Sequence, residues 1–511
     1  MSDLRAVVKK PIDNLVVAMT DHDLDKYSLL EKVLREADFF GVLSEHQKQS
    51  GIKQKDFKIV IKPNITMLLR RSDVGIYTDP FLAIHLLRLL RQKGYENLAV
   101  VESQNLYGNW FENRGVVQIA TRAGYFDETE TDFSRARDRE MVRVRGGGVD
   151  ASVPLIDLTL ERAPHDFGEP VGKIELGKTW MEADFRINFA KMKTHFYSDY
   201  SLAIKNIYGC LPLQDKVRGY HCRRVVGKWT ALVIRDFPVH FSIVDGYSAA
   251  DGWLGVKIKA VARKPHTLLA GADIQAVDHF GARLLKLEPE KSIMYRELMS
   301  LTPPASYRVV GDHQPVKPWR NSPHLLALFC QVIEANANIM DFSGSLATGG
   351  YDPCFPHESS NQGPLKRLLY YLSLPMNFFS DLGFAKLRWK EYLVSKKIRK
   401  YRNQLPVISG SEYLCKRLTF FGPEDLEFLI KVLEPGIPEE ISFSGHYLFL
   451  DGREIPFPAR LSTTNLAVVE MLRHLQPQRL EKRGLLDELR LIKRLFAELP
   501  GSESGYPYCF C

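Results

Sequence analysis

The chain has few cysteines, and their arrangement matches no common metal or disulfide motif. Its 511 residues include seven cysteines, an odd number scattered along the sequence, and no Cys-x-x-Cys pair. This excludes the paired-cysteine framework of small secreted domains and the common iron–sulfur cluster and zinc-ribbon motifs. Cys509 and Cys511 form a Cys-x-Cys tail that could bind metal or lipid, but a chain end without such a role is the favoured interpretation.

Long apolar runs and the usual nucleotide-binding motifs are also missing. No stretch reaches about 18 consecutive apolar residues, and the first residues lack the charged-then-apolar pattern of a secretory signal. The expected location is therefore the cytoplasm. Neither a Gly-x-Gly-x-x-Gly motif nor a Walker-type lysine motif occurs, so a standard dinucleotide or P-loop site has no support.

Charge of one sign is not in large excess. Lysine and arginine number 69 and aspartate and glutamate 61, a net charge of +8 that does not argue for nucleic acid as a partner. The hydrophobic fraction of 45% and the charged fraction of 25% are those of an average soluble globular protein. A chain of this length is expected to contain two or three domains.

What is present is an alternation of strand and helix patterns in the first 300 residues. The sequence predicts strands at 14–20, 58–62, 98–101, 240–244 and 268–271, and helices at 26–40, 80–94, 116–122, 228–236 and 274–285. Strand, helix and strand at these lengths indicate right-handed crossovers. The predicted fold class is α/β, with a mostly parallel sheet and flanking helices.

The composition changes after this part. Proline, glycine, serine and asparagine become frequent, which predicts a linker and loop region at 301–364. A mainly helical region with a β-hairpin around Asp451-Gly452 is expected at 365–511. Residues 1–300 would then form one α/β domain.

The segment from Lys366 to Arg402 has two interpretations. It is apolar and aromatic in its first half and basic in its second, as a segment lying on an anionic membrane surface would be. The favoured alternative is a helical pair packed on the main domain, with one basic face in solvent. A peripheral membrane location is therefore a weaker expectation than a cytoplasmic one.

Residue types that do chemistry are concentrated in residues 183–212. A strand pattern through Phe185, Ile187 and Phe189 comes first. After it the sequence has Lys191, Lys193, Thr194, His195, Ser198, Asp199, Ser201, Lys205, Asn206 and Gly209. Lysine is almost never fully buried without a partner, and α/β sheets place ligand sites at strand ends. The site is therefore expected here.

Spacing suggests how these residues could work together. Lys193 and His195 are two residues apart, so on an extended chain they point to the same side, where they could bind an anion and move a proton. A short helix over 201–208 could bring Lys205 back toward the strand end. Other polar residues follow predicted strands and are expected to converge on the same edge.

The predicted ligand is a small molecule that carries a phosphate or carboxylate group. The expected binding residues are Lys62, Asn64, Lys193, Lys205, Asn206 and Gly209. His195 is expected to act as acid or base, and Asp245 to orient a partner or a metal. Taken singly, a histidine after a strand is more often structural and Asp-Gly is more often a turn. Metal binding is less favoured, because no ligand pair has the spacing of a metal site.

Several short motifs occur in a fixed order, and together they resemble a known family. They are Lys62-Pro63-Asn64, Lys193-Thr194-His195, Lys205-Asn206-x-x-Gly209, Asp245-Gly246 and Gly271-Ala272-Asp273. The set, over about residues 14–290, resembles the uncharacterised family labelled domain of unknown function 362. The family implies a location for the site rather than one reaction. Many of its members carry a four-cysteine, ferredoxin-like cluster segment that implies redox work, which this chain lacks. A fainter similarity is to lactate-racemase-type enzymes, which use a nickel-bearing cofactor.

The leading hypothesis is therefore an intracellular enzyme that acts on an anionic small molecule, which could be lipid-linked or carrier-linked. One alternative is a non-catalytic assembly factor that holds a cofactor or ligand in the same cleft. A weaker alternative is a membrane-surface scaffold. A ligand that is retained through purification but not converted would separate the assembly factor from the enzyme. The sequence assigns no particular cofactor, metal or reaction class.

Overall fold

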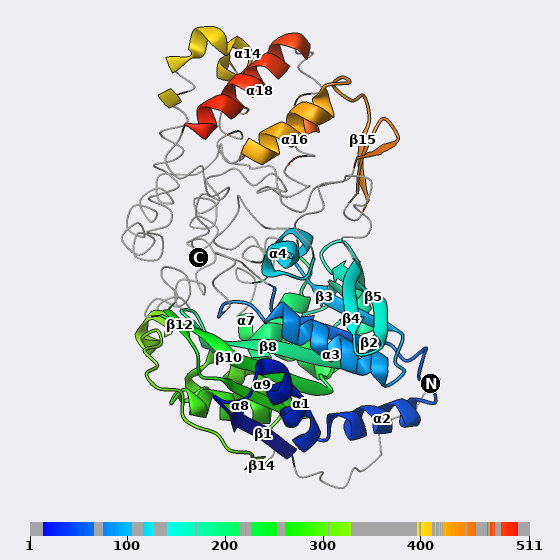
Figure 1. The fold of residues 1–511 in the computed structure, drawn as a ribbon. Helices are drawn as coiled ribbons and strands as arrows, with labels where there is room; N and C mark the ends of the chain where they lie inside the picture. Colours follow the sequence, from blue (N-terminus) through cyan, green and yellow to red (C-terminus); the bar gives the residue numbers. More distant parts are fainter. Residues whose placement is uncertain are drawn as a thin grey trace.

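The computed structural model describes most of the first 328 residues and parts of the last 116. The described residues are 14–65, 75–104, 116–126, 141–169, 171–213, 216, 220, 226–252, 261–304 and 306–328, followed by 396–397, 400–410, 414, 418, 421, 423–444, 447–455, 468, 471–473, 475 and 482–498. Figure 1 draws them in colour along the chain.

A mixed, mostly parallel sheet is the centre of the first part, which confirms the predicted α/β class. Its path in the described residues is β14-β1-β13-β10-β8-β2-β3-β5-β4, with β9 and β12 attached to β8 and β10. The bounds are β1 (Asn14–Thr20), β2 (Ile59–Pro63), β3 (Leu98–Glu102), β4 (Met141–Gly146), β5 (Val149–Asp157), β8 (Phe185–His195), β9 (Asp199–Ser201), β10 (Phe241–Asp251), β12 (Val261–Arg263), β13 (Thr267–Gly271) and β14 (Tyr307–Val310). The five strands β10, β8, β2, β3 and β5 run parallel to one another. A separate pair is formed by β6 (Arg162–Asp166) and β7 (Lys173–Gly177).

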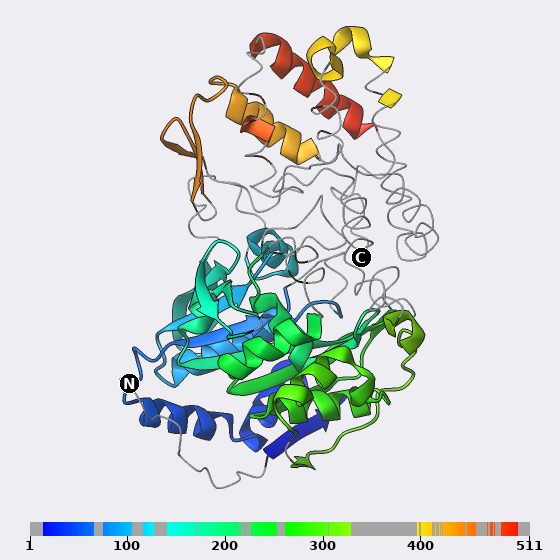
Figure 2. The same ribbon diagram turned by 180° about the vertical axis from the view of Figure 1, so that it is seen from behind.

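Helices cover both faces of this sheet (Figures 1 and 2). One apolar core joins it to α1 (Lys26–Glu36), α2 (Phe39–Ser50), α3 (Pro80–Gln92) and α4 (Val116–Ala123). The core on the other face includes α6 (Ala203–Ile207), α7 (Val226–Asp236), α8 (Ile274–Leu284) and α9 (Ile293–Leu301). Short elements, α5 (Lys178–Met181), η2 (Tyr208–Cys210) and η4 (Pro289–Lys291), complete this part. Because both faces are covered, the central strands are buried throughout.

Local signals located most helix ends correctly. Asp79 caps α3 by accepting a hydrogen bond from Phe81 N, and Asp273 caps α8 by accepting hydrogen bonds from Gln275 N and Ala276 N. The single helix expected at 26–40 is wrong. The chain breaks near Asp38, whose φ is +49°, and a second helix, α2, begins at Phe39.

The strand β8 is longer than the sequence pattern indicates. Alternation of apolar residues stops at Phe189, yet the strand continues to His195, and all but this last residue are buried. Parallel partners on both sides, β10 and β2, hold its first part, and β9 pairs with its end from Lys193 to His195. Lys191 and Lys193 are therefore strand residues, not loop residues.

The segment predicted as a linker contains part of the main sheet. Strand β14 pairs in parallel with β1, and the backbone nitrogens of Arg320 and Asn321 donate to Asp251 at 2.8 and 2.9 Å. The sheet therefore continues past residue 300, because a strand in this segment finds an open edge at β1. Residues 329–364 lie outside the described residues, and the division into domains stays a prediction.

The described residues after 395 form a mainly helical region with a hairpin, as predicted. Its helices are α14 (Pro406–Gly410), α16 (Pro423–Leu433) and α18 (Lys482–Ala497), with the short η6 (Arg402–Gln404) before them. Strands β15 (Ile441–Ser444), β16 (Tyr447–Leu450) and β17 (Arg453–Ile455) form a small antiparallel sheet. These elements share an apolar core of their own.

The membrane-surface interpretation of the segment from Lys366 to Arg402 stays a prediction. Most of the segment from Lys366 to Arg402 lies outside the described residues. Within the part of the chain that the structure describes, no helix combines the length and the apolar character needed to cross a membrane.

Candidate functional site

The parallel strands bring polar residues to one edge of the sheet. β2 ends at Lys62-Pro63 and β3 at Glu102, while β8 and β10 carry Lys191 and Asp245 side by side. In α/β sheets this carboxyl edge is where ligands bind. The sheet therefore brings the strand-end residues to one edge, as the sequence predicts.

A buried ion pair lies at the centre of this edge. Lys62 Nζ is 2.8 Å from Glu102 Oε2, and the two side chains are 1% and 0% exposed. Glu102 also accepts hydrogen bonds from the backbone nitrogens of Ile65 and Ser103, both at 3.0 Å. Burial of two charges is costly, so such a pair persists only where geometry and additional hydrogen bonds compensate. Removal of one partner would leave a buried charge.

Gly209 packs directly against this pair. A Cβ atom at this position would lie 2.3 Å from Glu102 Oε1 and 2.5 Å from Lys62 Nζ, closer than such contacts occur. The backbone oxygen of Gly209 accepts a hydrogen bond from Ser103 Oγ at 2.6 Å. Glycine is therefore required here because the η2 backbone must approach the ion pair closely.

A chain of side-chain amides links the predicted binding residues. Asn206 Nδ2 donates to the backbone oxygen of Lys62 at 3.0 Å and to Asn188 Oδ1 at 2.8 Å. Asn64 Nδ2 donates to Asn206 Oδ1 at 3.2 Å, and Lys193 Nζ donates to Asn64 Oδ1 at 3.3 Å. The structure thus brings Lys62, Asn64, Lys193 and Asn206 together, as the sequence predicts.

Lys205 lies beside this network with its ammonium group uncommitted to an acceptor. In the described part of the chain it makes no hydrogen bond or ion pair, and its Nζ lies 4.4 Å from the centre of the Tyr208 ring. Burial lowers the pKa of Lys205 to about 7, and the positive charges of Lys193, Lys216 and Lys62 add to this effect. Glu102 is the carboxylate that opposes them.

Lys216 was not singled out from the sequence. Its Nζ donates to Ser103 Oγ at 2.8 Å and to the backbone oxygen of Leu211, and burial lowers its pKa to about 7. The only sequence signal was a lysine soon after the Gly209 turn. Together, Lys62, Lys193, Lys205 and Lys216 are referred to below as the lysine cluster.

A carboxylate from α8 holds the helix that carries Lys205 and Asn206. Asp278 Oδ1 accepts a hydrogen bond from Ile204 N at 2.8 Å, while Leu202, at the N-cap position of α6, makes no side-chain cap. Asp278 is fully buried, and burial raises its pKa to about 7. The position of α6 therefore depends on a residue far along the chain.

His195 lies at the end of β8, where the chain turns into β9. Its Nδ1 accepts a hydrogen bond from Tyr197 N at 3.2 Å, and its ring stacks on that of Phe196. It pairs in register with Asp199, whose carboxylate lies 2.9 Å from His324 Nδ1. These contacts belong to the β8–β9 turn.

Asp245 is committed to contacts within the protein. It forms a fully buried ion pair with Lys191 at 2.7 Å and accepts hydrogen bonds from the backbone nitrogens of Asp79 and Tyr247. Burial raises its pKa, and the charge of Lys191 opposes this shift. The geometry favours a role in fixing the start of α3.

Two further observations bear on chemistry. Cys210 is fully buried, and burial raises its pKa to about 12, so it is a poor nucleophile at neutral pH. Over the described ranges, no three His, Cys, Asp or Glu side chains are grouped so that they could hold a metal ion.

A family model matches the part of the chain that contains these residues. Residues 59–283 match the family model described as Domain of unknown function (DUF362), which confirms the resemblance seen in the sequence motifs. The Thylakoid-associated protein sll1697 of Synechocystis sp. is 26% identical over 161 residues, which cover 30% of this chain and 49% of that protein. The match thus spans about half the length of this curated relative.

One solved structure superposes on part of this chain, with low similarity. The lactate racemase apoprotein from Thermoanaerobacterium thermosaccharolyticum superposes with a TM-score of 0.31 and 13% sequence identity. The superposition covers 53% of this chain and 57% of that one.

Proposed function

With the family match over residues 59–283 as the starting point, we propose that this chain is an enzyme that acts on a small carboxylate-bearing or phosphate-bearing molecule. The ligand would bind at the carboxyl edge of the sheet, in contact with Lys205. The observation that carries this proposal is the excess of positive charge in the lysine cluster, where Glu102, with Asp157 near Lys216, opposes four lysines.

The ammonium groups of the lysine cluster lie close together where water solvates them poorly. Burial penalises each charged group, and neighbouring charges of the same sign add to the cost. An anion beside Lys205 would supply the missing negative charge and the hydrogen-bond acceptor that its ammonium lacks in the described residues. Carboxylate and phosphate oxygens form strong charge-assisted hydrogen bonds with lysine.

The same residues suggest what the enzyme does with its ligand. A group with a pKa near 7 both gains and loses a proton readily at neutral pH, which is the requirement for general acid–base catalysis. Lys205 meets this requirement, and the amides of Asn64 and Asn206 would fix its surroundings. The proposed reaction is thus a proton transfer on an anionic substrate. His195 stays a candidate for a second acid or base, and Asp245 for orienting Lys191.

Binding can be tested with simple anions. Thermal unfolding would be followed with inorganic phosphate, acetate and malonate for the wild type, Lys205→Met and the control Lys178→Met. Lys178 is 54% exposed and forms only a surface pair with Glu182. At least one anion should raise the melting temperature of the wild type and of the control, but not that of Lys205→Met. Equal stabilisation of all three proteins would overturn the proposal.

Catalysis needs a separate test, because an assembly factor would also bind an anion. The wild type, Lys205→Met and His195→Ala would each be incubated with a small-molecule cell extract and the extract followed by mass spectrometry. Depletion of an anionic metabolite by the wild type, but not by Lys205→Met, supports an enzyme. Retention of a ligand without conversion supports the non-catalytic alternative. The His195→Ala result decides whether that histidine takes part.

A further inference from the structure

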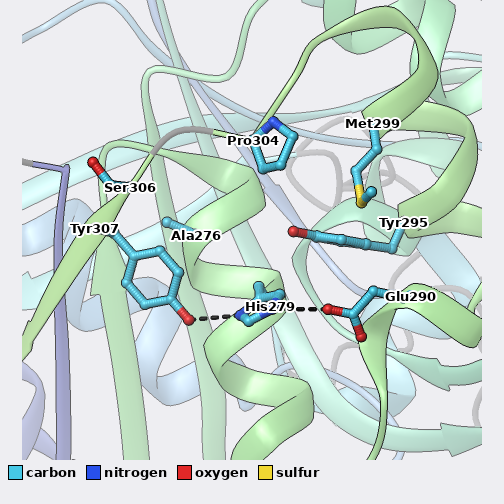
Figure 3. Close-up of a pocket in the computed structure, with 8 residues that line it drawn as sticks. All are labelled: Ala276, His279, Glu290, Tyr295, Met299, Pro304, Ser306 and Tyr307. Atoms are coloured by element: carbon cyan, nitrogen blue, oxygen red, sulfur yellow. Dashed lines mark hydrogen bonds and ion pairs between the residues drawn. The ribbon is translucent and has the colours of Figure 1, made fainter.

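A cavity lies between α8, α9 and β14 and shares no residue with the lysine cluster. Its volume is about 450 Å³ (Figure 3), within the range of roughly 300–1,000 Å³ found for small-molecule sites. Its lining residues are Ala276, His279, Glu290, Tyr295, Met299, Pro304, Ser306 and Tyr307. The cavity is therefore large enough for a small organic ligand.

Tyr295 presents a polar group, its phenol hydroxyl, to the cavity. Its side chain is 97% buried, being only 3% exposed, and Figure 3 shows its hydroxyl end directed toward the other lining residues. In the described part of the chain this hydroxyl makes no hydrogen bond. Its oxygen remains accessible from the cavity, so it can bond a molecule that enters there. A ligand group in the cavity would supply the bond.

Aromatic and apolar side chains form the walls. The ring of His279 lies 5.6 Å from those of Tyr295 and Tyr307. His279 is held at both nitrogens, with Tyr307 Oη 2.6 Å from Nδ1 and Glu290 Oε1 3.2 Å from Nε2. These contacts fix the ring, while Met299 and Pro304 offer apolar surface opposite.

Carboxylates lie at and near the cavity: Glu290 lines it, and Asp278 and Asp273 are close enough to Tyr295 to act on its hydroxyl. Burial raises the pKa of the Tyr295 phenol, and the negative charges of Asp278, Glu290 and Asp273 raise it further. Arg283, 3.6 Å from Glu290, is the nearby cation and is half-exposed at the rim. A cationic ligand is therefore favoured over an anionic one, the reverse of the preference at the lysine cluster.

We propose that this cavity binds a small organic cation, a protonated amine that carries an apolar or aromatic group. Its ammonium would donate a hydrogen bond to Tyr295 Oη and pair with the Glu290 carboxylate. The faces of Tyr295 and Tyr307 would attract the same charge through cation–π contact. The apolar part would lie against Met299 and Pro304.

Three probes with the same ring and different charges test this proposal. They are 2-phenylethylamine, 2-phenylethanol and 3-phenylpropionate, a cation, a neutral molecule and an anion at neutral pH. Binding to the full chain would be measured by ligand-observed NMR and calorimetry. The amine should bind about tenfold more tightly than the alcohol, as expected for a cation–π and ion-pair contribution, and the carboxylate should bind least. Equal affinities, or no binding of the amine at millimolar concentration, would overturn the proposal.

Substitutions of lining residues test whether the amine binds in this cavity. Glu290→Gln should remove most of the preference for the amine over the alcohol, and Tyr295→Phe should weaken amine binding while keeping the ring. Glu288→Gln is the matched control, because Glu288 is 60% exposed, pairs with Lys291 and does not line the cavity. Unchanged amine affinity in both Glu290→Gln and Tyr295→Phe would place the amine elsewhere and overturn the proposal. Melting temperatures confirm that each variant is folded.

Discussion

Asp278 Oδ1 lies 2.8 Å from the backbone nitrogen of Ile204, so α8 caps the first turn of α6 across 74 residues of sequence. α6 has only five residues and no capping side chain of its own. A helix this short is not stable alone in water. The placement of Lys205 and Asn206 therefore depends on one carboxylate from another element.

Asp278→Ala should destabilise the protein by about 1–3 kcal/mol, because Ile204 N loses its acceptor inside the core. It should also weaken anion binding at Lys205, since the first turn of α6 is no longer held. Asp278→Asn keeps an oxygen acceptor and should retain most of both properties. Urea unfolding and phosphate titration measure the two effects. Wild-type stability and binding in Asp278→Ala would contradict the capping role.

The pH dependence of stability provides an independent test of Asp278. Its pKa is raised from 3.8 to about 7 in the folded protein, so the folded state holds a proton that the unfolded chain releases between these values. Its contribution to stability is therefore greatest at low pH and is lost as the pH rises toward 7, at up to about 1.4 kcal/mol per pH unit. Asp278→Asn should lack this decline relative to the wild type. Parallel stability curves from pH 4 to 7 would contradict the assignment.

Lys205 should show a trend of the opposite sign at higher pH. Its pKa is lowered from 10.5 to about 7, so above pH 7 the unfolded chain binds a proton that the folded state does not. Stability should therefore rise between about pH 7 and pH 10.5, by at most about 1.4 kcal/mol per pH unit. Lys205→Met should lose this rise and be more stable than the wild type at pH 7. A less stable variant without this change in slope would mean that Lys205 is structural.

Gly209→Ala should be strongly destabilising, by about 2–4 kcal/mol, since its Cβ overlaps the Lys62–Glu102 pair and forces one charge from its partner. The same substitution at Gly484 in α18 meets no atom within 4 Å. It should stabilise the protein by up to about 1 kcal/mol through helix propensity. Chemical denaturation of both variants measures the contrast. Equal effects would show that the ion pair can move away at little cost.

Breaking the Lys62–Glu102 pair should cost far more than breaking a surface pair. Lys62→Met leaves the carboxylate of Glu102 buried without its counter-ion, for an expected loss of about 3–5 kcal/mol. Arg490→Ala, which removes surface pairs with Glu434 and Asp487, should cost at most about 1 kcal/mol. Lys62→Met combined with Glu102→Leu should recover part of the loss. Failure of the double variant to recover would indicate that other contacts of Glu102 dominate.

Much of the fold follows from local signals in the sequence. Apolar runs predict the central strands, and Asp79 and Asp273 predict where α3 and α8 begin. Lys62, Asn64 and Lys193 lie together because neighbouring parallel strands end at one edge, a rule that needs only the order of the elements. Their convergence could therefore be predicted before the structure was known.

The remaining features depend on tertiary contacts that leave no local pattern. The end of β8 is extended because β9 folds back on it. The unusual φ of Asp38, which separates α1 from α2, belongs to no motif. Lys216 joins the lysine cluster through Ser103, a residue 113 positions earlier. His195 follows a predicted strand, but its contacts were set by the turn that comes after it.

The hydrogen bond from Asn64 Nδ2 to Asn206 Oδ1 closes a loop of 142 residues. Contacts so distant in sequence carry a large entropic cost and form slowly compared with local helices. The anion site therefore cannot exist in an intermediate that holds only the N-terminal strands. Recovery of anion binding during refolding should trail the recovery of helical signal, which makes the ligand a reporter for the last stage of assembly.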